Sequence, residues 1–456
     1  MNEERRPLRR LVDTPRDFVY RQVFLTAQNF IRIEAASGIV LLLATIVALV
    51  WANSPWSDSY TDLWHTHITI NADIFDIDLD LQEWVNDGLM TLFFFLAGLE
   101  IKRELVHGEL SSPRRALLPA AAALGGMITP AVFFLAIAGG SDGADGWGIP
   151  MATDIAFAVG ILALLSRRIP ASIRVFLLAL AIADDIGAIL VIAVFYTSDI
   201  NFLALGIAGL TLAVIVVCNR SGLRNVDVYV LFGAVLWVAM LESGIHATLA
   251  GVILGLLTPA SHHYDPATFA EDADDLVQRY RGATQASDRG EQESVLHQME
   301  DLAHGTEAPL ERLERALVSW VSFLIVPLFA LANAGVQIDG DTVEAAIESP
   351  LALGVAIGLV VGKPLGIFMF TWLAVQLKLC DKPVGASWAQ IFGVGMIAGI
   401  GFTISLLITS LAFEEQALVD EAKLGVLAGS TVAGIAGLVF LYFASRPSKS
   451  ESLLVE

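Results

Sequence analysis

The sequence predicts an all-α membrane protein with twelve spanning helices, and three observations support this class. First, 55% of the 456 residues are hydrophobic and only 16% are charged, whereas an average globular chain carries roughly 25% charged residues. Second, apolar runs of about 20 residues recur along the chain, each long enough to cross a hydrocarbon core about 30 Å thick as a helix. Third, lysine and arginine are concentrated in alternate loops. None of the runs shows the alternation of a strand, which excludes a membrane β-barrel.

The predicted spans are separated by polar loops, and the first span follows a basic N-terminal segment, 1–35. The apolar run that starts at Ala36 has no small-residue cleavage site, so we interpret it as a retained span and not as a signal peptide. Spans one to eight occupy 36–258, and spans nine to twelve occupy 313–444. The individual spans are 36–53, 82–101, 116–138, 147–166, 173–196, 201–218, 227–242, 245–258, 315–336, 350–377, 388–412 and 424–444.

The basic residues predict the orientation, because short cytoplasmic loops retain lysine and arginine and exported loops largely exclude them. Segment 1–35 holds seven arginines, and the loops after spans two, four, six and ten all hold basic residues. The loops after the odd-numbered spans hold none, apart from Lys423 at the mouth of the last span. We therefore expect a multi-pass protein of the bacterial inner membrane, with the N-terminus and the tail, 445–456, in the cytoplasm.

Two loops are unusually long. The extracytoplasmic loop 54–81 contains a strictly alternating stretch, 68–81, which predicts a short β-hairpin. Its open edge favours pairing with a second copy of the chain, and hence a homodimer, although packing against its own chain is the alternative. The cytoplasmic loop 259–312 holds twelve acidic residues against four arginines. We interpret this loop as a partly helical or disordered connector, with a regulatory domain as the alternative.

The cysteines and the histidines of the acidic loop do not form a pattern that binds a metal or another cofactor. Cys218 and Cys380 lie in separate hydrophobic regions, which indicates neither a disulfide framework nor a zinc site. The histidines of the acidic loop also lack metal-ligand spacing; they are His262, His263, His297 and His304. We expect no resident cofactor and no nucleic-acid partner.

Asp184 and Asp185 lie side by side near the middle of the fifth span. Each charged residue at the centre of a membrane helix costs about 3 kcal/mol, so a pair is expected to have a function, usually in the path of an ion or proton. The alternative is that both only bridge helices by hydrogen bonds. Neighbouring residues point about 100° apart on a helix, so one carboxylate can face an aqueous cavity while the other faces a packed helix.

Lys363 is the only basic residue between Arg315 and Lys378, a stretch that covers two predicted spans. A buried ammonium group is expected to pair with an acid or to lose its proton. We predict that Lys363 pairs with one of the acids of the fifth span, Asp184.

Two spans carry signs of interruption. In the fourth, Thr153 and Asp154 follow Pro150 within an apolar run, and in the eleventh the segment 393–405 is rich in glycine. Unwound backbone is tolerated at membrane depth where it lines a cavity, and its carbonyl groups can coordinate ions there. In the alternative interpretation, Asp154 only caps a half-helix.

A faint internal similarity supports inverted repeats of three helices. Residues 155–157, Ile-Ala-Phe, correspond to 400–402, Ile-Gly-Phe, and Thr129-Pro130 corresponds to Lys363-Pro364.

Polar residues elsewhere in the predicted spans have less certain roles. Glu100, Arg103 and Glu104 share one face at the cytoplasmic end of span two, where such a cluster often simply reaches the interface. Asp87 and His246 fit a buried polar contact as well as a functional group.

These motifs resemble the NhaA family of sodium/proton antiporters. The matching stretches are 84–90 (Trp-Val-Asn-Asp-Gly-Leu-Met), 98–105, 152–157, 179–189, 246–251, 328–336, 362–366 and 399–403. They cover nearly the whole chain in order. The resemblance implies a twelve-helix fold with inverted repeats, in which spans four and eleven are interrupted and cross.

The resemblance also implies an activity and roles for residues. The chain is expected to be a secondary transporter and not an enzyme, exchanging cytoplasmic sodium or lithium for external protons electrogenically and under control of pH. Asp185 resembles the principal ion ligand and Asp184 the acid paired with Lys363, while Thr153 and Asp154 complete the site. The residues at positions resembling the pH-response cluster are Glu100, Arg103, Glu104 and Glu314, to which we add His246.

The chain departs from this pattern in two places. Arg315 and Val318 stand where some relatives carry histidines, and the acidic loop is longer. Both bear on the pH threshold and not on the ion site.

Other functions explain the two acids less well. A sodium-coupled solute symporter of similar fold is the alternative, but no lining for a large solute is evident. An intramembrane aspartyl hydrolase needs its two acids on separate helices, and an ion channel has no use for a pair of acids that binds protons.

Overall fold

The computed structural model describes residues 36–72, 75–166, 168–197, 200–221, 226–261 and 268–445. The predicted N-terminal segment 1–35, most of the C-terminal tail, the turn of the predicted hairpin, and His262 and His263 lie outside these residues.

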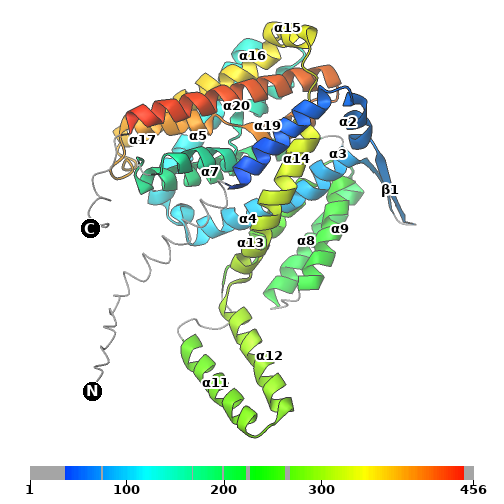
Figure 1. Cartoon of the computed structure of the whole chain (residues 1–456), viewed down its shortest axis with the longest axis vertical. Coiled ribbons are helices and arrows are strands. Elements are labelled where there is room, and N and C mark those ends of the chain that lie inside the picture. The colour runs from blue at the N-terminus through cyan, green and yellow to red at the C-terminus, as the bar shows by residue number, and fades with distance from the viewer. Residues whose placement is uncertain are drawn as a thin grey trace, which may run out of the picture.

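The described chain is mainly helical, and most of its helices form one bundle (Figure 1). The helices are Ala36–Ala52, α2 (Ser57–Trp64), α3 (Leu81–Glu83), α4 (Met90–Val106), α5 (Pro113–Ala138), α6 (Ile155–Leu164), α7 (Ala171–Phe195), α8 (Phe202–Arg220), α9 (Val226–Leu241), α10 (Thr248–Leu257), α11 (Phe269–Gln285), α12 (Arg289–Thr306), α13 (Pro309–Trp320), α14 (Val326–Asn333), α15 (Gly340–Glu348), α16 (Pro350–Ile357), α17 (Lys363–Gln376), α18 (Trp388–Ala398), α19 (Phe402–Ala412) and α20 (Gln416–Ala444). Short 3-10 or π-helical segments join or precede some of them: η1 (Trp84–Leu89), η2 (Glu109–Ser111), η3 (Ala144–Met151), η4 (Val321–Ile325) and η5 (Gly358–Gly362).

Seven helical stretches of the described chain, one of them η3 with α6, are long and apolar enough to cross a membrane. Two bent pairs raise this number to nine if each pair is one span: Ala36–Ala52 with α2, bent by 115°, and α18 with α19, bent by 45°. Two further apolar helices of the described chain are shorter than a span: Val228–Leu241, within α9, and α10 (Thr248–Leu257). The chain is thus a multi-pass membrane protein, while the number of twelve spans stays a prediction.

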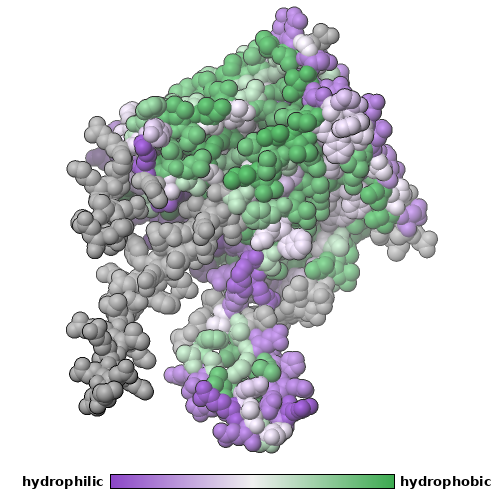
Figure 2. All heavy atoms as spheres, viewed as in Figure 1, coloured by the Kyte–Doolittle hydropathy of each residue, from purple (hydrophilic) through white to green (hydrophobic). Residues whose placement is uncertain are grey.

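The surface of the bundle is apolar, as a lipid-facing surface requires. Large hydrophobic side chains are exposed along several helices, among them Leu164, Val194 and Leu210. Figure 2 shows an almost continuous hydrophobic face over the bundle, with hydrophilic residues gathered at its margins and on α11 and α12. A water-soluble monomer rarely exposes so large an apolar area.

The helix contacts nearest the site depend on close backbone approach. Gly125 of α5 faces Gly366 of α17 so closely that a Cβ atom at Gly125 would lie 2.2 Å from the Gly366 carbonyl oxygen. Small residues at such contacts let membrane helices pack by their backbones. This contact fixes the position of α17, which carries Lys363 at its first residue.

A two-stranded sheet and a pair of helices lie outside the bundle. Strands β1 (His67–Ala72) and β2 (Phe75–Asp80) form an antiparallel two-stranded sheet in which Ile70 pairs with Ile77. Helices α11 and α12 pack against each other beyond the end of α13 (Figure 1). They share a small hydrophobic cluster of their own, formed by Leu276, Val295 and Leu302. Most of the acidic stretch therefore consists of two packed helices.

Candidate functional site

Asp184 lies at the centre of the candidate site, in the middle of α7, with 1% of its surface exposed. Its Oδ2 atom accepts hydrogen bonds from Lys363 Nζ and from Thr153 Oγ1, both at 2.7 Å. Its Oδ1 atom is equally buried but has no hydrogen-bond partner among the described residues. One oxygen of this carboxylate is thus held by the protein, and the other is buried without a partner among the described residues.

Lys363 is completely buried, with 0% of its surface exposed. It follows the π-helical segment η5 and begins α17, and its ammonium group also donates to the Met151 carbonyl oxygen. An ammonium group in such a place requires a nearby acid, because an unpaired charge is costly away from water. The structure places Asp184 in that position.

The chain is extended between η3 and α6, at residues 152–154. It is also interrupted between α18 and α19, at residues 399–401. The two interruptions contact each other, since the Asp154 amide donates to the Ile400 carbonyl oxygen at 2.6 Å. A backbone amide that has no helical partner at one break is thereby hydrogen-bonded to a carbonyl group at the other break.

Asp154 is buried where the two helices that follow these breaks begin. Its Oδ1 atom accepts a hydrogen bond from the Phe157 amide of α6 at 3.1 Å. Its Oδ2 atom accepts from the Thr403 amide of α19 at 3.1 Å and from the Thr403 hydroxyl at 2.7 Å. One carboxylate therefore caps two helix N-termini, whose partial positive charges favour an anion.

The Thr153 hydroxyl joins these elements to α7. It lies 2.7 Å from Asp184 Oδ2 and 3.0 Å from the Ala398 carbonyl oxygen. A hydroxyl group has a single proton, so it donates to only one of these two acceptors at a time.

Asp185, unlike Asp184, faces an open cavity. Its carboxylate makes no hydrogen bond within the described part of the chain. The cavity has about 670 Å³ of empty space, including the part open to solvent. Its walls come from the first helix, α4, residues 153–156, α7, α19 and the region of η4 and α14. The polar residues that line it are Ser37, Glu100, Thr153, Asp154, Asp185, Ser322 and Thr403.

The charge of this cavity favours cations. Three of its lining residues, Glu100, Asp154 and Asp185, carry carboxylates, and none of the described residues that line it is a lysine or an arginine. Low-dielectric walls focus the field of such charges and raise the local concentration of the opposite ion.

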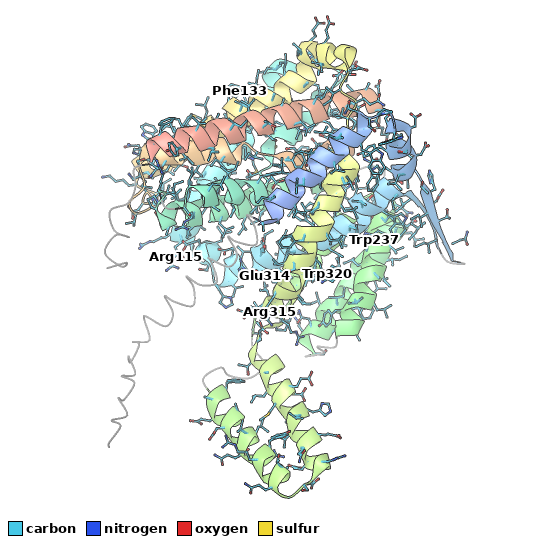
Figure 3. All side chains as sticks on the ribbon, viewed as in Figure 1. Arg115, Phe133, Trp237, Glu314, Arg315 and Trp320 are labelled. Atoms are coloured by element: carbon cyan, nitrogen blue, oxygen red, sulfur yellow. The ribbon has the colours of Figure 1, made fainter. Side chains whose placement is uncertain are left out.

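Three of the predicted pH-response residues lie together at the C-terminal half of α4. Arg103 forms an ion pair with Glu314 of α13, and its other guanidinium nitrogen lies 4.0 Å from Glu104. Glu314 is buried within α13, whereas the sequence places it just ahead of a span that begins at 315. Figure 3 shows Glu314 and Arg315 near the middle of α13. Glu100 extends this cluster into the cavity.

His246 is not part of that cluster. It lies in the connection between α9 and α10, and its Nε2 atom contacts the carbonyl oxygen of Tyr196, which ends α7. Asp87 is likewise separate, in η1, where its carbonyl oxygen accepts from the Trp237 indole at 2.8 Å.

The sequence analysis assigned no role to Thr403, which bonds to Asp154. A hydroxyl residue directly after the glycine-rich break was the available signal. Ser322 was missed as well, because a serine is common in membrane helices and the hydrophobic pattern does not show that it faces a cavity.

A multi-pass helical bundle that holds a buried aspartate–lysine pair beside an acidic cavity defines an integral membrane protein that transports cations. The comparisons with known proteins identify the class. The chain belongs to the sodium/proton antiporter family whose model is described as Na+/H+ antiporter 1, which matches residues 28–441.

Relatives of similar length support this assignment. The chain is 48% identical to the Na(+)/H(+) antiporter NhaA of Koribacter versatilis, over 93% of this chain and 92% of that relative. It is 46% identical to the Na(+)/H(+) antiporter NhaA 2 of Sorangium cellulosum, over 94% and 92% respectively. It is 44% identical to the NhaA antiporter of Rhizobium meliloti, over 92% and 95%.

Proposed function

We propose that sodium and protons compete for the carboxylates of Asp184 and Asp185, and that this competition underlies sodium/proton exchange by this chain. As a member of the antiporter family the chain is a secondary transporter and not an enzyme. Exchange requires only that both ions use the same oxygen atoms and that the site opens to one side of the membrane at a time. One observation supports this proposal above the others: Asp185 faces the cavity, whereas Asp184 faces Lys363.

Asp185 is the principal sodium ligand in this proposal. Sodium is a hard cation that prefers carboxylate, hydroxyl and carbonyl oxygens. Asp154 and Thr153 line the same cavity and supply oxygens of these kinds. Asp154 also keeps the two helix breaks together through its bonds to Phe157 and Thr403.

Asp184 and Lys363 complete the exchange. When Asp184 is ionised, Lys363 balances its charge; when sodium occupies the site, the free Oδ1 atom of Asp184 gives the ion a second carboxylate. If both acids take part, more than one proton moves for each sodium ion, and net charge crosses the membrane. Exchange is therefore electrogenic, and lithium, also a hard cation, is transported too.

The proposal places the site in a twelve-span inner-membrane protein with both termini in the cytoplasm. Spans four and eleven are the two interrupted, crossing helices of an inverted repeat, a proposal supported by the contact of the breaks near Asp154 and Ile400. Residues 259–312 form an acidic cytoplasmic connector between spans one to eight and spans nine to twelve. The two-stranded sheet within 54–81 joins two copies of the chain in a homodimer.

We propose further that pH controls turnover through Glu100, Arg103, Glu104 and Glu314. The ion pair between Arg103 and Glu314 joins α4 to α13, and both helices continue into walls of the cavity. His246, which lies apart from this cluster, contributes to pH dependence through its contact with the end of α7.

Sodium-induced proton movement in inside-out vesicles tests the proposed site. A pH-sensitive dye follows exchange across a range of pH for the wild type, Asp184→Asn and Asp185→Asn. Loss of exchange in both variants, with normal insertion in the membrane, supports the assignment. Retained exchange in Asp185→Asn contradicts it, and sodium uptake without proton movement points to a symporter.

A further inference from the structure

The wall of the cavity that faces Asp185 includes Ser322, a residue to which the family motifs give no role. Ser322 is the second residue of the π-helical segment η4, between α13 and α14. It lines the same cavity as Asp185, together with Val321 and Val326. We propose that the Ser322 hydroxyl contacts sodium in this cavity and helps to set the affinity of the transporter for the ion; this inference rests on the proposed function.

The π-helical geometry of η4 widens the face on which Ser322 and Val326, four residues apart, both lie. A π-helical turn is wider than an α-helical turn because its hydrogen bonds join residues five apart, as between Val321 and Val326 in η4. The wider turn lets Val321, Ser322 and Val326 share one face, although residues 321 and 326 would diverge on a regular α-helix. Segments of this kind are frequent at functional sites.

The hydroxyl of Ser322 is available to a ligand. A hydroxyl group inside a helix usually donates to the carbonyl oxygen one turn earlier, as Thr45 does to Leu41 and Thr409 does to Ser405, both at 2.8 Å. Ser322 makes no such bond, and no other hydrogen bond within the described part of the chain. Its oxygen therefore keeps its lone pairs free towards the cavity.

The other hydroxyl groups of the cavity are already engaged. Thr153 contacts Asp184, Thr403 bonds to Asp154, and Ser37 also has a partner. These donors keep lone pairs for a cation, but their orientation is already set by the protein; among the described lining residues, Ser322 is the hydroxyl whose proton and lone pairs are both uncommitted.

The chemistry of the cavity favours sodium as the ligand. Glu100, Asp154 and Asp185 make it acidic, and the described lining residues include no positive side chain. A hydroxyl oxygen is a suitable ligand for a hard cation. The side chains of Val321 and Val326, on either side of Ser322, have no oxygen that could bind an ion. The Ser322 hydroxyl is therefore the polar side-chain group that this wall presents to sodium.

Sodium-dependent exchange in inside-out vesicles tests this role with Ser322→Ala, Ser319→Ala and Asp185→Asn. Ser319 is exposed on α13 and lies outside the cavity, which makes it the matched control. Loss of one contact with the ion is expected to raise the half-saturating sodium concentration about threefold to tenfold in Ser322→Ala. The maximal rate should stay close to that of the wild type, and Ser319→Ala should be unchanged.

The same experiment separates two failures. If Asp185→Asn is inactive and Ser322→Ala has the sodium dependence of the wild type, the role of Ser322 is wrong and the proposed site stands. If Asp185→Asn still exchanges ions, the proposed site fails and this inference fails with it.

Protection of a cysteine at position 322 by sodium tests binding without transport. This measurement does not depend on the folding of Ser322→Ala. Ser322→Cys is made in a chain with Cys218→Ser and Cys380→Ser and is labelled with a charged thiol reagent. Sodium should slow labelling relative to an equal concentration of choline, and adding Asp185→Asn should remove the protection. Equal labelling in sodium and choline overturns the proposal.

Discussion

The ammonium group of Lys363 lies 2.7 Å from Oδ2 of Asp184, and neither side chain has more than 1% of its surface exposed. The two residues come from helices that are far apart in the sequence, α17 and α7. Their contact is a buried ion pair, whose members are costly to leave unpaired. It links the chemistry of the site to the stability of the bundle.

The first prediction concerns this pair. Lys363→Met should destabilise the protein by about 3–5 kcal/mol, because it leaves the Asp184 carboxylate buried without its partner. Adding Asp184→Asn should recover most of that loss while exchange remains absent. Thermal unfolding in detergent, beside vesicle transport, measures both effects. A double variant as unstable as Lys363→Met alone would show that the pair does not couple the two helices.

The second prediction concerns the double cap at Asp154. Asp154→Ala removes hydrogen bonds to two helix N-termini and should cost about 2 kcal/mol, at roughly 1 kcal/mol for each cap. Asp154→Asn should lose less, because asparagine also caps helices well. Unfolding midpoints of the two variants measure this difference. Equal losses would mean that the negative charge, and not capping, stabilises the breaks.

The third prediction concerns competition between protons and sodium. Lower pH protonates the carboxylates that sodium needs, so the half-saturating sodium concentration should rise as pH falls. Where one proton competes with one sodium ion, the rise approaches about tenfold per pH unit. Dye measurements over a grid of sodium and pH give this slope. A half-saturating concentration that is independent of pH would rule out a shared site.

The fourth prediction concerns the ion pair between Arg103 and Glu314. If the two act as one unit, Arg103→Ala and Glu314→Gln should shift the pH profile of exchange in the same direction and by a similar amount. The double variant should add little, because coupled residues are not additive. Arg312→Ala, which alters a nearby residue of α13 that lies outside the pair, serves as the control. Fully additive shifts would show that the two residues act independently.

The fifth prediction concerns α11 and α12. Replacing 269–306 by a short glycine–serine linker should leave the maximal exchange rate close to that of the wild type, because these helices pack on their own cluster around Leu276 and Val295. The chain on either side of this segment is already held together, since the Leu310 amide donates to the Pro259 carbonyl oxygen at 3.2 Å. The ion pair of Glu307 with Arg315 is kept in this variant. A completely inactive, correctly inserted protein would show that the two helices are needed for transport.

The predictability of each feature depends on whether its cause is local. Hydrophobicity and the cost of a charge in lipid act residue by residue, so the membrane class, the approximate helices and the prediction of a role for Asp184, Asp185 and Lys363 follow from the sequence alone. The helical pairing of α11 and α12 was less accessible, because an acidic polar stretch is compatible with both helix and disorder.

How these residues meet depends on the packing of the helices. The rotation of α7 about its axis, which turns Asp184 to Lys363 and Asp185 to the cavity, is set by packing against neighbouring helices. The same packing brings Asp154 to the N-termini of both α6 and α19, leaves His246 apart from Arg103 and turns Ser322 into the cavity. Which residues are costly to bury can be read from the sequence, because that cost is local; their partners depend on contacts between distant segments, which no local pattern encodes.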